Sequence, residues 1–76
     1  MTNALQPLQA AIDADAYDWL AQHAPGYVAA IEKALQAGSN PTQIRRFMQA
    51  QVGPDRAGLA LRCEQAARYL AEAQTA

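Results

Sequence analysis

Alanine occupies 19 of the 76 positions, and this abundance restricts the possible folds more than any other feature of the sequence. Alanine is the best helix former, while the β-branched residues that favour strands are scarce in this chain. We therefore expect an all-α fold, a compact bundle of four to five short helices with a long C-terminal helix. We expect residues 1–76 to form a single helical domain, since the chain has the length of one small domain.

Three short segments that contain proline and glycine predict the helix boundaries. They cover residues 24–26, 38–41 and 53–55. Glycine suits the left-handed position that follows a helix, and proline suits the first turn of the next one. These breaks divide the chain into helical segments at about 5–23, 26–37, 41–51 and 54–74.

The first segment contains an acidic interruption. Asp13 and Asp15 flank Ala14, and Asp18 lies three residues after Asp15, the spacing of a capping box. This pattern favours two short helices, at about 4–12 and 16–23, over one bent helix.

The start of the third segment carries a stronger signal. Asn40 is a favourable N-cap, Pro41 fits the first helical position, and Gln43 stands where the second residue of a capping box belongs. A helix is therefore expected to begin at Pro41.

The last segment predicts a narrow apolar seam and an exposed charged ladder. The seam repeats at intervals of four and three residues, through Leu59, Cys63, Ala66, Leu70 and Ala73. Glu64, Arg68 and Glu72 follow one another at i, i+4 and i+8 on the opposite, solvated side. Leu61 falls on that side too, where it either contacts a partner or is covered by neighbouring segments.

Charge is unevenly distributed along the chain. Residues 1–32 contain four acidic residues and no base, while residues 33–76 contain six bases and three acids. Either the two halves pack together and neutralise each other, or the asymmetry marks a partner-binding face. It also suits head-to-tail self-association, which salt would then weaken.

The sequence offers no set of residues for catalysis, metal binding or cofactor binding. Cys63 is the only thiol and His23 the only imidazole, and Cys63 lies in the apolar seam, where a thiol is normally protonated and inert. His23 follows Trp19 by one helical turn, so we expect the two rings to stack. We predict no enzymatic activity, no cofactor, no metal and no small-molecule substrate.

The sequence also bears on where in the cell the protein is found. No stretch reaches the roughly 20 apolar residues of a membrane span, and the N-terminus does not resemble a signal peptide. We therefore expect no membrane association, and a cytoplasmic protein.

The middle of the chain resembles the helix-turn-helix pattern. Ala34, Gly38, Ile44 and Phe47 match a small residue at a helix crossing, a glycine in the turn and two buried positions in the second helix. The resemblance implies a recognition helix at 41–51. Base edges would be contacted by Thr42, Gln43, Arg46 and Gln49, and phosphates by Arg45 and Arg56. A pI of about 5.6 argues against DNA binding.

Together these features predict a small non-enzymatic protein-interaction module, a regulator or adaptor, that binds a protein partner or itself through charged helix faces. The predicted contact residues are Gln43, Arg45, Arg46, Gln49, Arg56 and Leu61. A helix-turn-helix DNA-binding domain is the alternative, so DNA stays a possible partner.

Overall fold

Helices account for nearly all of the part of the chain that the computed structural model describes, residues 6–75. The elements are α1 (Gln6–His23), α2 (Pro25–Gln36), α3 (Pro41–Val52), the short 3-10 helix η1 (Pro54–Arg56) and α4 (Ala57–Thr75). The predicted all-α fold with a long C-terminal helix is confirmed. The last helical segment begins with the single turn of η1 before it becomes α4.

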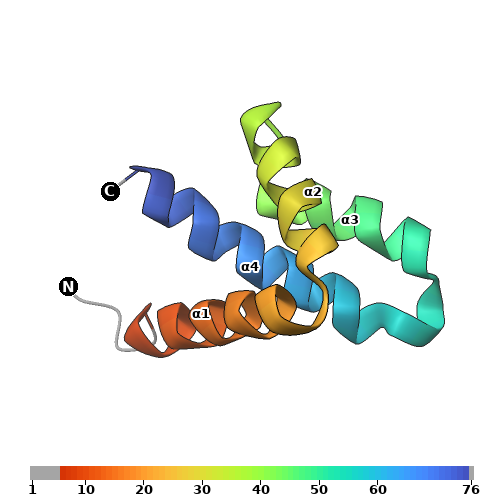
Figure 1. Ribbon diagram of the computed structural model, residues 1–76, viewed down its shortest axis with the longest axis horizontal. Coiled ribbons are helices and arrows are strands. Elements are labelled where there is room, and N and C mark those ends of the chain that lie inside the picture. The colour runs from red at the N-terminus through yellow and green to blue at the C-terminus, as the bar shows by residue number, and fades with distance from the viewer. Residues whose placement is uncertain (1–5, 76) are drawn as a thin grey trace.

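The long helix α4 forms the centre of the fold. In Figure 1 it runs through the middle of the molecule, with α1 below it and α2 above, and it packs against each of the other three α-helices. Small side chains permit this close approach, because Ala60, Cys63, Ala66 and Ala67 are fully buried. The larger core side chains come from the surrounding helices and are Leu20, Val28, Ile31, Ile44 and Met48.

The buried face of α4 is wider than the predicted seam. Cys63 and Ala66 are buried as expected, but Ala60 and Ala67 are buried as well, whereas Ala73 is exposed. Three helices surround α4 rather than one, so a strip of positions beside the seam is covered too.

The prediction of two short helices before residue 24 is wrong. The chain forms one continuous helix, α1, through Asp13 and Asp15. Asp13 is buried and bonds to side chains rather than to the backbone. It therefore does not compete for the backbone N–H groups that would end the helix, and Asp15 caps nothing.

The boundaries of α3 follow the sequence closely. The Asn40 side chain accepts a hydrogen bond of 2.8 Å from the backbone N–H of Gln43, and the Gln43 side chain accepts one of 2.9 Å from the backbone N–H of Asn40. The predicted capping box is confirmed. Gly38 and Gly53 have φ of 99° and 80°, values that glycine adopts without the cost of a side chain.

The helices α2 and α3 touch each other much less than each touches α4. The side chains that α3 buries are Ile44 and Met48, while Phe47 is 64% exposed. The expectation that Phe47 is buried against the core is therefore wrong. Phe47 lies to one side of the stripe that faces the core, where α2 does not approach closely enough to cover it.

Candidate functional site

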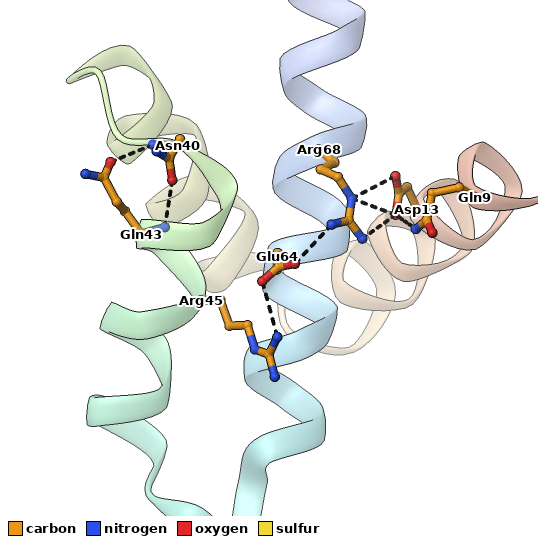
Figure 2. A network of polar contacts seen from close by, with 7 residues as sticks. All are labelled: Gln9, Asp13, Asn40, Gln43, Arg45, Glu64 and Arg68. Carbon is orange, nitrogen blue, oxygen red and sulfur yellow. Dashed lines mark hydrogen bonds and ion pairs between the residues drawn. The ribbon is translucent and has the colours of Figure 1, made fainter. Parts of the chain in front are cut away.

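Five polar side chains form a network across one side of α4, which we call the polar clasp. Its members are Gln9, Asp13, Arg45, Glu64 and Arg68 (Figure 2). The Asp13 carboxylate, only 2% exposed, accepts hydrogen bonds from Arg68 Nε at 3.2 Å and Nη2 at 3.3 Å, and from Gln9 Nε2 at 3.0 Å. A buried carboxylate thus has both of its oxygens engaged.

The clasp continues from Arg68 to the third helix. Arg68 Nη1 donates to Glu64 Oε1 at 3.0 Å, and Glu64 Oε2 lies 3.6 Å from Arg45 Nη1. The hydrogen bond to Asp13 raises the pKa of Arg68, so the guanidinium keeps its charge. The clasp therefore connects α1, α4 and α3, and its role is structural.

The polar clasp tests two of the sequence predictions. Glu64 and Arg68 were expected on a solvated face, and this is wrong, because their side chains are only 12% and 34% exposed and both hold neighbouring helices. The expectation that the acidic and basic halves pack and neutralise each other is confirmed at the pair of Asp13 and Arg68. The spacing of four residues correctly indicated the ion pair of Glu64 with Arg68. It did not indicate the partners on other helices, Asp13 for Arg68 and Arg45 for Glu64.

Aromatic side chains strengthen the same α1–α4 contact. Trp19 and His23 lie against each other as predicted, with ring centroids 4.7 Å apart, but the ring planes are tilted by 36° rather than stacked. The Arg62 guanidinium lies 4.0 Å from the Trp19 ring centroid. Tyr17 and Tyr69 stack at 4.9 Å. Arg62, like Arg45 and Arg68, is thereby engaged within the fold.

A long apolar depression lies between α2 and α3, and we call it the α2/α3 groove. It consists of two adjoining hollows of about 440 and 530 Å³ that share Ala30, Phe47 and Met48. The first is completed by Ile31, Ala34, Ser39, Gln43 and Ile44, and the second by Ala24, Gly26, Tyr27, Gln51 and Val52. Among the described residues that line it none is charged, so the groove is suited to an apolar side-chain row.

A charged residue of α3 adjoins the groove residues in sequence without lining the groove. Arg46 directly precedes Phe47, is exposed, and forms no ion pair with any residue in the described part of the chain. Aromatic residues, methionine and arginine are the types enriched where proteins contact each other. Phe47, Met48 and Arg46 bring all three together on one helix.

The predicted contact residues do not form one surface. Arg45, Arg46 and Gln49 line a shallow hollow with Thr42 and Glu64, while Gln43 lines the α2/α3 groove. Arg56 is exposed on η1, and Leu61, 39% exposed, belongs to α4.

Several predicted contact residues already have partners. Gln43 belongs to the capping box of α3, Gln49 Nε2 donates to the Gly53 carbonyl oxygen at 2.9 Å, and Arg45 pairs with Glu64. Sequence reasoning did not identify the groove. The signal available for it was the offset of Phe47 from the stripe of Ile44, Met48 and Val52, which recurs every four residues.

The chemistry of the remaining reactive groups is limited. Cys63 is fully buried, and burial raises the pKa of its thiol from 9.0 to about 11, so it is protonated near neutral pH. Within residues 6–75, no three His, Cys, Asp or Glu side chains gather where they could hold a metal ion. No helix in that same range has the length and apolar character needed to cross a membrane.

Comparison of the chain with protein-family models, with curated proteins and with solved structures finds no match.

Proposed function

We propose that this protein is a small interaction module, a regulator or adaptor without enzymatic activity, that binds the apolar face of an amphipathic helix in the α2/α3 groove. The observation that carries the proposal is Phe47, which is 64% exposed at the groove and the most exposed large hydrophobic side chain of those described. A folded protein gains nothing from an aromatic ring left in water, whereas a bound helix would bury it.

The composition of the groove supports a helical partner. Ala30 and Ala34 leave room along α2, so a helix can approach closely, and Met48 can adapt its shape to different apolar side chains. Arg46 beside the groove would favour acidic residues on the rim of the partner helix. We expect the module to act in the cytoplasm, since its single cysteine needs no oxidising compartment.

Photo-crosslinking in the cells that make the protein tests this proposal. We would place p-benzoylphenylalanine at position 47, and at position 61 as the matched control, because Leu61 is also an exposed hydrophobic residue but lies on α4 outside the groove. The proposal requires a protein adduct at position 47 that is absent at position 61. Adducts at 61 alone, or at neither position, would contradict it.

A DNA-binding function is the second candidate, and it is supported by the turn between α2 and α3. Four residues join the helices, Gly38 has positive φ, and Thr42 and Arg46 are exposed on α3. Against it, Arg45, Arg62 and Arg68 are engaged within the fold, which leaves few cations for phosphates.

Fluorescence anisotropy of a labelled duplex distinguishes this second candidate. A DNA-binding domain would show nonspecific affinity of about 10⁻⁴–10⁻⁶ M that falls steeply between ~50 and ~200 mM salt. Arg46→Ala would weaken that binding. No binding up to ~100 µM protein at the lower salt would exclude the DNA candidate.

A further inference from the structure

A second apolar surface lies on α1, away from the α2/α3 groove, and we call it the α1 stripe. Leu8, Ile12 and Trp19 are 58%, 39% and 39% exposed. At 100° per residue they fall within about 40° of one another around the helix axis, so they form one row. Fold stability explains only part of this row. Arg62 of α4 lies over the Trp19 ring, but the buried face of α1 is made by other residues, among them Ala16 and Leu20.

The charges in and beside the α1 stripe are mainly acidic. Asp15 stands at the edge of the row itself, about 20° from Leu8 around the helix axis and next to Ile12 and Trp19. Asp15 and Asp18 are exposed, and neither forms an ion pair with a residue in the described range. Among the described residues, the cation that contacts the row is Arg62, whose guanidinium lies over the Trp19 ring. The α1 stripe therefore has the chemistry proposed above for the helix that the groove accepts: an apolar row with acidic neighbours.

The two surfaces also agree in length. Eleven residues separate Leu8 from Trp19, which at 1.5 Å per residue gives a row of about 16 Å. On α3 the groove extends from Gln43 to Val52, nine residues or about 14 Å. The row of one molecule can thus lie along the whole groove of another.

We propose that the occupant of the α2/α3 groove is the α1 stripe of a second copy of this chain, so that molecules associate head to tail. This inference rests on the proposed function of the groove. The signs of the charges select this arrangement over symmetric ones. A groove-to-groove contact would bring Arg46 toward its own copy, and a stripe-to-stripe contact would do the same for Asp15 and Asp18.

A head-to-tail contact leaves one groove and one stripe unoccupied at the ends of every assembly. Such heterologous contacts form open chains or closed rings rather than stopping at the dimer. The wild-type protein should therefore show a mass that rises with concentration past that of a dimer.

Sedimentation velocity with variants that block one surface each provides the test. Phe47→Glu blocks the groove and leaves the stripe intact. Leu8→Glu with Ile12→Glu blocks the stripe and leaves the groove intact. Glutamate is a good helix former, so the helices are retained. Each variant alone should be monomeric, with Phe47→Glu weakening association about thirtyfold or more, as expected for a hot-spot residue. An equimolar mixture should form a 1:1 heterodimer and nothing larger.

Two further variants guard against loss of folding. Asp15→Lys with Asp18→Lys changes only exposed charges and should weaken association about two- to fivefold. Leu61→Glu, outside both surfaces, should associate like the wild type. A wild-type chain that stays monomeric up to ~1 mM would overturn the proposal, as would a mixture of the two blocked variants that remains monomeric. If position 47 then crosslinks to a different protein, the head-to-tail proposal fails while the proposed function of the groove stands.

Discussion

The contact between α1 and α4 and the contact between α2 and α3 are built in opposite ways. Along α1 and α4, the Asp13 carboxylate is held by Arg68, and the Tyr17 ring stacks on Tyr69. Between α2 and α3, the Phe47 ring has no such cover and is 64% exposed. The first contact uses polar and aromatic groups to stabilise the fold, whereas the second leaves apolar surface open to solvent.

This difference shows where function is to be sought in a domain of this size. Half of the six Lys and Arg side chains contact neighbours along α4 and are therefore engaged within the fold. Within the described residues, every fully buried side-chain nitrogen and oxygen has a hydrogen-bond partner. The fold also leaves apolar side chains exposed to solvent, in the α2/α3 groove and in the α1 stripe.

Truncating one apolar residue in each region should show this difference most strongly. Leu20 is fully buried, so Leu20→Ala is expected to lower the free energy of unfolding by about 2–5 kcal/mol. That loss is enough to unfold much of a domain this small. Phe47→Ala should change stability by no more than about 0.5 kcal/mol. Urea denaturation followed by circular dichroism measures both, and equal costs would show that Phe47 is part of the core.

Removing one member of the polar clasp should have the next largest effect. Arg68→Met leaves the buried Asp13 carboxylate with Gln9 as its remaining partner, and is expected to cost about 1.5–3 kcal/mol. The double variant Asp13→Leu with Arg68→Met removes both charges and should recover most of that loss. If the double variant is as unstable as the single one, the cost comes from packing rather than from the stranded charge.

The buried thiol predicts a loss of stability at high pH. Because the pKa of Cys63 rises from 9.0 to about 11 on folding, the folded protein keeps this proton where the unfolded chain loses it. The resulting stability is complete below pH 9 and declines between about pH 9 and 11, by up to about 2–3 kcal/mol. Cys63→Ala serves as the control, and its unfolding free energy should fall less steeply over that range. Identical slopes would rule out the thiol as the cause.

The smallest effect concerns how α3 is held in place beside the groove. Asn40→Ala removes the side-chain acceptor of the capping box and should cost about 1 kcal/mol. Thermal unfolding would measure this loss. A variant as stable as the wild type would mean that packing on α4 alone fixes the start of α3.

Local signals in the sequence predicted the elements, because their causes lie within a few residues. Proline and glycine fixed the breaks around α2 and α3, and Asn40 with Gln43 fixed the start of α3. Asp13 was misinterpreted as part of a helix boundary because its partner, Arg68, is 55 residues away along the chain. A local rule cannot include a partner that only the tertiary fold brings near.

The candidate site was predicted less well for a related reason. Helical periodicity showed which side of α3 is apolar, but not that this side packs on α4 and leaves Phe47 uncovered. Of the predicted contact residues, Gln43 lines the groove, Arg46 directly precedes the groove residue Phe47, and Leu61 is on a separate surface. Which polar residues are free to bind a partner depends on which ones the neighbouring helices have already engaged.

The use of the groove can be tested most directly by recording ¹H–¹⁵N correlation spectra of the labelled protein from dilute to concentrated solution. Our interpretation predicts that amide signals of the α2/α3 groove, including those of Ala30, Phe47 and Met48, shift together with those of the α1 stripe. Signals of the polar clasp at Glu64 and Arg68 should stay unchanged. Shifts confined to the clasp, or no shifts up to ~1 mM protein, would contradict head-to-tail binding in the groove.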